Sequence, residues 1–291
     1  MTRDYWLQVA YQLQDRCRRE PGRKVELLLR MTDAYLKAHY YDAATMVCRS
    51  VLKLEPFNVQ AMVRLGRCLL GKKEFKAAEK LYSSLTDLVA SLDEAWWGLW
   101  AAFKGQKEHK AAAKAVETIL AKKPDDKRAR KQAAEDREAA GDTEAAIFHL
   151  EKLYERGEQS SDIAHKLAEL LLLCSEKCRA LHYLEVALDQ DRTQPELLLL
   201  AADTAFSLRD WKKAASLATE RLEAGAFSCR ALELLGRARL ELDEFDGAIL
   251  SLERLVDKAP DNLSYRLLLA EAFYRAGELK DAEVELNRCL A

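Results

Sequence analysis

An alanine recurs every 34 residues through most of this 291-residue chain, and that period limits what the chain can fold into. The eight alanines are Ala44, Ala78, Ala112, Ala146, Ala180, Ala214, Ala248 and Ala282. They take position 20 of repeats that start at residues 25, 59, 93, 127, 161, 195, 229 and 263. A fixed period of roughly 20–50 residues is typical of arrays in which one small structural unit is stacked many times.

The stretch from Cys229 to Asn262 shows this unit most clearly. Its apolar and small residues are Leu232, Leu235, Gly236, Phe245, Ala248, Leu252 and Leu255, with Pro260 near the end. Within each half the spacing is three or four residues, so each half predicts a helix with one apolar stripe. Gly236 and Ala248 are small where the two stripes meet, which lets the helices pack closely. Because a single hairpin cannot bury its faces alone, its neighbours must repeat it.

These positions resemble the tetratricopeptide repeat signature. An aromatic residue also recurs at position 17, as Tyr41, Phe75, Trp211 and Phe245. The resemblance covers residues 25–291 and implies an all-α fold, a right-handed superhelical α-solenoid of antiparallel helix pairs. We therefore predict seventeen helices and no strand: a capping helix and turn in residues 1–24, then eight pairs in which helix A spans positions 2–14 and helix B spans positions 18–31.

Two parts of the array depart from the pattern. The fourth repeat has Arg130, Ala133, Ala134 and Arg137 where large apolar residues are usual, and the third has Trp100 at the small position 8. We expect Trp100 to fill the space beside this thin helix and the middle of the array to be its weakest interface. The sequence ends at Ala291, inside the last predicted helix B, so we expect that end to be covered by a longer chain, a second copy or another subunit.

Composition favours a protein of the cytoplasm. No apolar run approaches the ~18 residues that a membrane-spanning helix needs, and Met1–Arg19 has no uninterrupted apolar region typical of a secretion signal. The seven cysteines are scattered and odd in number, which favours reduced thiols. Charge is uneven: cations exceed anions by six in residues 1–92, whereas anions exceed cations by seven in residues 161–291.

No motif in the sequence indicates catalysis, so we predict no enzyme activity, no cofactor and no metal. There is no glycine-rich phosphate loop and no nucleophile elbow. Cys174, Cys178 and His182 are four residues apart, but the predicted turn separates Cys174 from the other two. A closed zinc site needs four ligands, and these three have no second cluster near them in the sequence.

The family resemblance also implies a docking surface. In tetratricopeptide repeats, positions 2, 5, 6, 9, 12 and 13 of helix A line a concave face that holds peptides or partner helices. Carried onto this chain, the predicted partner-binding residues are Arg30, Arg64, Arg67, Trp97, Lys104, Arg128 and Lys131. In the last four repeats these positions offer more carboxylates than cations, with Leu199, Phe206, Leu267 and Tyr274 among them, so we expect the groove to run from basic to acidic. The carboxylates are Asp162, Glu169, Glu196, Asp203, Glu233, Glu241 and Glu271. The alternative interpretation is a set of solvated positions without a binding role.

Two function classes follow. The first is a non-enzymatic interaction scaffold or adaptor that holds an acidic protein segment with apolar anchors on the concave face, within a multiprotein assembly. The second is RNA binding by the basic N-terminal third, around Arg16, Arg18, Arg19, Arg23 and Lys24. Helical-repeat RNA readers need basic and stacking groups at the same positions of each repeat, and this chain lacks such a column. We therefore favour the scaffold, with nucleic acid not expected as the main partner and no membrane insertion.

Overall fold

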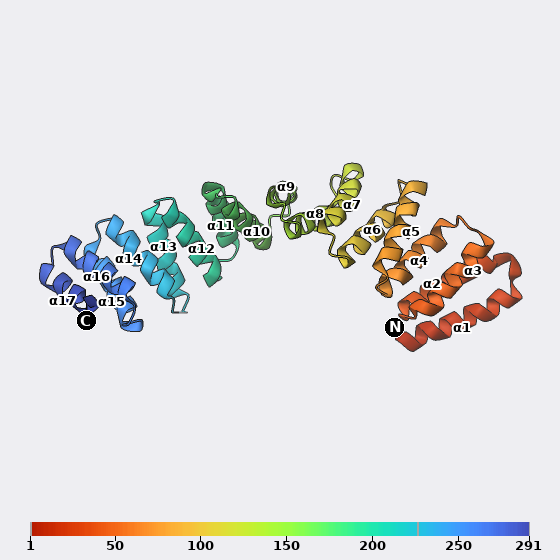
Figure 1. Cartoon of the computed structure of the whole chain (residues 1–291), viewed down its shortest axis with the longest axis horizontal. Helices are drawn as coiled ribbons and strands as arrows, with labels where there is room; N and C mark the ends of the chain where they lie inside the picture. The colour runs from red at the N-terminus through yellow and green to blue at the C-terminus, as the bar shows by residue number, and fades with distance from the viewer. Residues whose placement is uncertain (1, 226, 291) are drawn as a thin grey trace. The chain divides into compact units, whose positions relative to one another are not determined.

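The computed structural model describes residues 2–225 and 227–290, and over these residues the chain is helical throughout (Figure 1). It contains seventeen α-helices, one short 3-10 turn at Pro21–Arg23, and no strand in the described part. This confirms the predicted all-α solenoid of helix pairs. None of the described helices is long and apolar enough to span a membrane.

The helices follow the 34-residue period. The first is α1 (Arg3–Arg19), and helix A of each pair is α2 (Lys24–Lys37), α4 (Val59–Gly71), α6 (Asp93–Gly105), α8 (Lys127–Ala139), α10 (Ser161–Leu173), α12 (Pro195–Ser207), α14 (Cys229–Glu241) or α16 (Leu263–Ala276). Helix B is α3 (Tyr41–Leu54), α5 (Phe75–Leu88), α7 (His109–Lys122), α9 (Thr143–Glu155), α11 (Lys177–Gln190), α13 (Trp211–Glu223), α15 (Phe245–Lys258) or α17 (Leu279–Leu290). Every helix B begins at position 17, one residue earlier than predicted.

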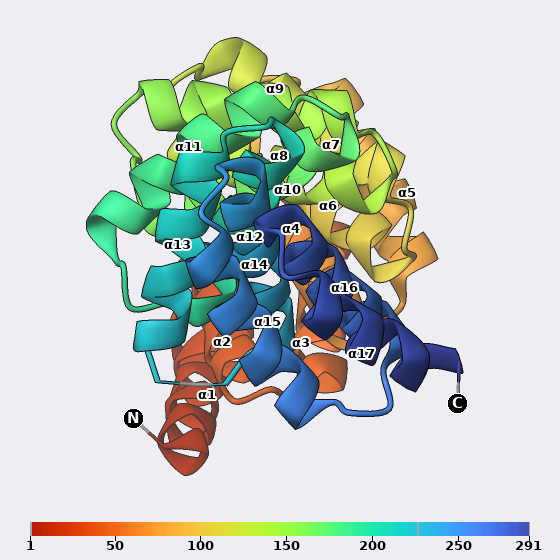
Figure 2. The ribbon, with the colours of Figure 1, turned by 90° about the vertical axis from the view of Figure 1, so that its left-hand side faces the viewer.

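The chain forms two compact units, Met1–His149 and Leu150–Ala291, which we call the first and second units. In the first unit α1 packs against α2, and the A helices α2, α4 and α6 also contact one another directly. In the second unit α12, α14 and α16 do the same, as the view in Figure 2 lets the reader follow. Direct contact between successive A helices gives a continuous surface built from helix A alone over α2, α4 and α6 in the first unit and over α12, α14 and α16 in the second.

The recurring alanine lies at the centre of each helix pair. All eight position-20 alanines are buried, with Ala282 at 4% exposure and the other seven at 0%. Gly236 serves the same purpose on helix A, because a Cβ there would lie 2.6 Å from Leu252. In the first unit the fully buried Tyr82 fits between Gly66 and Gly98, whose Cβ atoms would lie 2.4 Å and 2.2 Å from its ring. These small residues allow neighbouring helices to approach closely.

The turn between helix A and helix B has the same geometry in all eight pairs. Position 15 has a left-handed backbone, with φ between 57° and 86°, at His39, Lys73, Lys107, Gly141, Ser175, Arg209, Asp243 and Gly277. The next N–H bonds to the carbonyl five residues earlier, as in Glu74 N to Leu69 O at 2.9 Å. This is a Schellman motif, which ends helix A and directs the chain into helix B. This left-handed turn cannot be predicted from the sequence, because only two of the eight residues are glycine.

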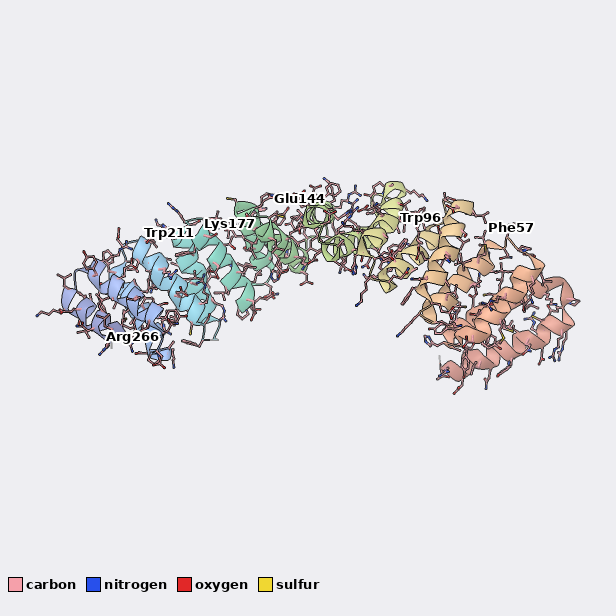
Figure 3. All side chains as sticks on the ribbon, in the orientation of Figure 1. Phe57, Trp96, Glu144, Lys177, Trp211 and Arg266 are labelled. Atoms are coloured by element: carbon pink, nitrogen blue, oxygen red, sulfur yellow. The ribbon has the colours of Figure 1, made fainter. Side chains whose placement is uncertain are left out.

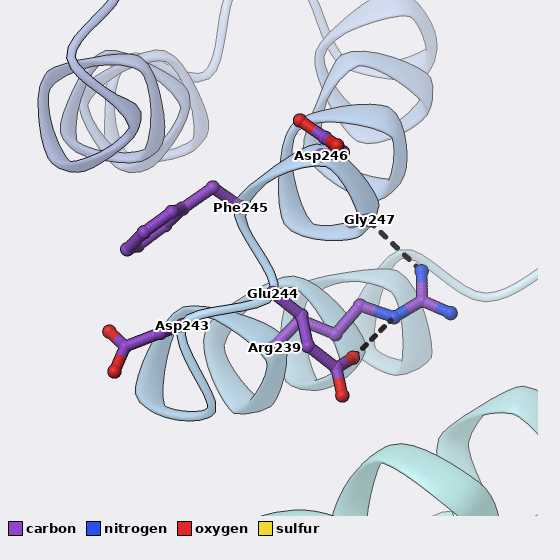
Figure 4. Close-up of a pocket in the computed structure, with 6 residues that line it drawn as sticks. All are labelled: Arg239, Asp243, Glu244, Phe245, Asp246 and Gly247. Carbon is purple, nitrogen blue, oxygen red and sulfur yellow. Dashed lines mark hydrogen bonds and ion pairs between the residues drawn. The ribbon is translucent and has the colours of Figure 1, made fainter.

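In the seventh pair an arginine reinforces this turn (Figure 4). Arg239 Nη1 donates hydrogen bonds to Gly247 O and to Ser251 Oγ, both at 2.9 Å, and Arg239 Nε lies 3.9 Å from Glu244 Oε2. A Cβ on Gly247 would lie 3.1 Å from Arg239 Cδ, so glycine leaves room for the arginine to cross to helix B.

We predict that Gly141→Ala destabilises the protein by about 1 kcal/mol, because alanine is strained at a positive φ of 77°. Nothing lies within 4 Å of the added Cβ, so the effect reports backbone strain without a clash. Gly22→Ala in the same unit is the matched control, since Gly22 also has open space and no positive φ. Urea unfolding followed by circular dichroism measures both. Equal stability of the two variants would contradict the assigned turn conformation.

Candidate interaction surface on the A helices

The helix A stripe of the first unit consists of positions 2, 5, 6, 9, 12 and 13 of α2, α4, α6 and α8. Ion pairs join neighbouring helices across it. Arg64 Nε and Nη2 each lie 2.8 Å from an oxygen of Asp33, which ties α4 to α2 in a bidentate pair. Arg67 Nη2 lies 3.7 Å from Glu94 Oε1, which links α4 to α6. Arg64 keeps only 20% of its side chain exposed, so it acts largely as an internal tie.

Trp97 is half-buried rather than freely exposed. The Cζ atom of Arg128 lies 4.4 Å from the centre of the Trp97 ring, so one face of the indole is covered by a guanidinium. The ring also meets Trp100 edge to face, with centroids 5.4 Å apart. A stacked guanidinium keeps its in-plane N–H donors available for a carboxylate. The predicted aromatic anchor and the predicted cation thus form one preassembled pair.

Trp100 connects this pair to a buried carboxylate. Its Nε1 donates a hydrogen bond of 2.6 Å to Asp136 Oδ2, and the Asp136 side chain is only 1% exposed. Lys104 Nζ lies 3.6 Å from Asp136 Oδ1 and donates to Gln132 Oε1 at 3.2 Å. Trp100 also packs with Val116, Ile119, Leu120, Ala129 and Ala133. It therefore fills the space beside the thin helix α8, as the sequence predicts.

The seven predicted residues fall into two groups. Arg64, Trp97 and Lys104 are partly buried, whereas Arg30, Arg67, Arg128 and Lys131 are exposed. Two of the exposed residues, Arg67 and Arg128, also contact side chains of α6. Sequence reasoning missed Asp136 and Gln132, which fix the position of Lys104. The one available signal was the bulky Trp100 at a position that is usually small.

A second charged cluster joins helix α8 to α7 and α9 through Glu117, Arg137 and His149. Arg137 Nε and Nη2 each lie 2.7 Å from an oxygen of Glu117 on α7, and His149 Nε2 lies 3.2 Å from Glu117 Oε1. The hydrogen bonds from His149 and Arg137 lower the pKa of Glu117 to about 2. Arg137 stands where large apolar residues are usual, so a partly buried ion cluster replaces the missing apolar contacts. Whether the middle of the array opens first stays a prediction.

Other expected features have definite places in the structure. Cys174 ends α10 and Cys178 lies on the exposed surface of α11, and the seven cysteines are free thiols. Among residues 2–225 and 227–290, no group of three His, Cys, Asp or Glu side chains is arranged to hold a metal.

The last helix, α17, exposes Leu279, Val284, Leu286 and Leu290. The expectation that another segment or subunit covers them stays a prediction.

Comparison with known families and structures agrees with this architecture. Two family models described as tetratricopeptide repeat match residues 35–103 and 233–288, and one described as anaphase-promoting complex, cyclosome, subunit 3 matches residues 139–220. The chain is a tetratricopeptide repeat protein. That all eight predicted repeats belong to this family stays a prediction. No curated protein sequence matches the chain.

Similar solved structures show the same fold at low identity. A chain from a structure of Naa15/Naa10 bound to HypK-THB matches with a TM-score of 0.71 and 17% identity, over 86% of this chain and 39% of that chain. A tetratricopeptide repeat protein from Parabacteroides merdae ATCC 43184 matches with a TM-score of 0.51 and 15% identity, over 86% of this chain and 98% of its own. The MamA protein matches with a TM-score of 0.51 and 16% identity, over 56% and 90% respectively. This chain thus spans about two fifths of the Naa15/Naa10 chain that it resembles.

We predict that Trp100→Phe destabilises the first unit by about 1–3 kcal/mol, because it leaves the buried Asp136 carboxylate without its indole donor. Trp96→Phe is the matched control. Trp96, which is labelled in Figure 3, also lies on α6, and the change removes the same atoms. Its indole, however, donates to the exposed carbonyl of Ala90. That control should cost less than about 1 kcal/mol, since water can replace the bond. Chemical unfolding measures the free energy of unfolding of both variants. Equal decreases in the two would contradict a special role for the Trp100–Asp136 bond.

We also predict an acid-sensitive contribution to stability from Glu117. Its pKa lies below the ordinary value of 4.5, so its ionised form stabilises the fold above pH about 4.5, and this contribution is lost as the pH falls toward 2. Between pH 5 and pH 2.5, Glu117 should lower the free energy of unfolding of the parent protein by on the order of 1–3 kcal/mol. Glu117→Gln should lack this decrease. Glu108→Gln, at an exposed carboxylate of the same unit, controls for net charge. An unchanged pH dependence in Glu117→Gln is the contrary result.

Proposed function

We propose that this protein is a non-enzymatic interaction scaffold that holds an acidic segment of a partner protein, with apolar anchors, on the helix A stripe of its first unit. The observation that carries this is the Arg128–Trp97 pair, which stands on the same stripe as the exposed cations Arg30, Arg67 and Lys131. Clustered aromatic and arginine side chains are typical of binding hot spots. Exposed cations around them steer an acidic partner and set its orientation.

The charge of the whole stripe supports an acidic partner. Its cations are Arg30, Lys37, Arg64, Arg67, Lys104, Arg128 and Lys131, and its carboxylates are Glu26, Asp33, Glu94, Glu135 and Glu138. Several of these pair across helices, but cations remain in excess. A ligand carboxylate can therefore reach unsatisfied guanidinium and ammonium donors without displacing every internal pair.

The class of protein supports a scaffold in a multiprotein assembly. Tetratricopeptide repeat folds are typically non-catalytic, and one similar structure contains Naa15/Naa10 bound to HypK-THB. That assembly belongs to the similar protein, and we extend only its general character to this chain. Seven free thiols are in keeping with a reducing compartment such as the cytoplasm.

The test is capture of a partner by the full chain, followed by kinetics with two kinds of variant. The double variant Arg67→Glu, Lys131→Glu should slow association, and more strongly at low salt, because exposed charges act mainly on the association rate. Trp97→Ala should instead speed dissociation and weaken binding by about 2 kcal/mol.

Lys110→Glu on α7 is the control for the charge change, since Lys110 is exposed on a helix B. It should leave both rates unchanged. If the captured partner binds all variants like the parent, the helix A stripe of the first unit is not the site. If nuclease treatment abolishes capture, the RNA-binding alternative replaces the scaffold.

A further inference from the structure

We infer that the second unit carries a separate docking surface, of opposite charge preference, for a basic protein segment with an apolar anchor side chain. It is formed by the A helices α12, α14 and α16. The surface shares no residue with the stripe proposed above for the acidic partner, so the two sites can be tested independently.

The surface contains a hollow of about 190 Å³. Three of its lining residues are apolar: Leu240 and Leu268, at 2% and 9% exposure, and the half-buried ring of Phe206. The other three are one cation, Arg237, and two carboxylates, Glu241 and Glu271. Arg237 is itself paired with Glu233, with Nη2 3.1 Å from Oε1. This volume is several times the ~30 Å³ that a water molecule takes in the liquid, but below the ~300 Å³ of the smaller small-molecule sites. It therefore suits one apolar side chain of a larger ligand.

Exposed apolar groups continue the hollow along α16. Leu267 is 50% exposed and Tyr274 is 67% exposed, and the spacing of Leu267, Glu271 and Tyr274 by four and three residues puts them on one helix face. Glu271 lines the hollow itself. An aromatic and an aliphatic side chain exposed next to a partly apolar hollow supply contact area for a ligand.

The charge at the rim selects a basic ligand. Glu241, Glu271 and Asp243 share one cation, Arg275, at distances of 3.4, 3.9 and 3.7 Å. Their side chains are 45%, 55% and 75% exposed, so these ion pairs are weak and leave carboxylate oxygens facing solvent.

The imbalance extends along the stripe of the second unit. Over α12, α14 and α16 its carboxylates are Glu196, Asp203, Glu233, Glu241 and Glu271, whereas its cations are Arg230, Arg237 and Arg275. A lysine or arginine of a ligand would therefore find carboxylates in excess, and an acidic segment would be repelled.

The test uses the full chain and two fluorescein-labelled short peptides, one of lysine and leucine and one of glutamate and leucine. Fluorescence anisotropy should show binding of the lysine peptide to the parent protein, and its affinity should fall as salt is raised. Glu271→Lys should weaken that binding by about tenfold, and Tyr274→Ala should weaken it several-fold with little change in the salt dependence. Both side chains are exposed, so neither change should unfold the protein.

Two controls separate this site from general charge attraction and from the first unit. Glu283→Lys makes the same charge change at an exposed residue of α17 and should leave the affinity for the lysine peptide unchanged. Arg67→Glu should leave it unchanged too, whereas it should weaken binding of the glutamate peptide. The inference is overturned if the lysine peptide does not bind, if Glu271→Lys binds it like the parent, or if Glu283→Lys weakens it equally.

Discussion

The small position-20 alanine of helix B underlies the whole structure. It is buried in every pair, and it allows two helices to lie close enough for their remaining apolar residues to interdigitate. Because each pair buries only part of its apolar surface, stability comes from stacking one pair on the next. The A helices then meet directly within each unit and form the surface on which both proposed sites lie.

This part of the fold could be predicted from the sequence because it rests on small residues at a fixed period. The 34-residue spacing placed the sixteen helices of the eight pairs, and helices A and B begin one or two residues earlier than predicted. The first helix lies outside this period and was predicted from its own apolar spacing. The left-handed turn at position 15 could not be predicted in the same way. Residues such as Lys73 and Arg209 carry no sequence signal for a positive φ, and it is the Schellman bonds of the finished turn that hold them there.

The candidate site was predictable in its charge but not in its contacts. Position along helix A was enough to gather Arg64, Trp97 and Arg128 on one stripe. It could not tell that Arg64 pairs with Asp33 or that Arg128 covers Trp97, because those pairings depend on the lateral distance between neighbouring helices. The polar contacts of α8 could not be predicted either. Trp100 on α6 bonds to Asp136 on α8, and Arg137 on α8 bonds to Glu117 on α7, so both contacts depend on how neighbouring helices pack.

We propose that the A helices of the first unit hold a partner segment, while the B helices serve the packing. Photo-crosslinking tests it most directly, with benzoylphenylalanine placed in turn at two exposed positions, residue 131 on α8 and residue 110 on α7. In the presence of the captured partner, position 131 should form a crosslink to it and position 110 should not. A crosslink from position 110 with none from position 131 would contradict the assignment of the partner to the A helices.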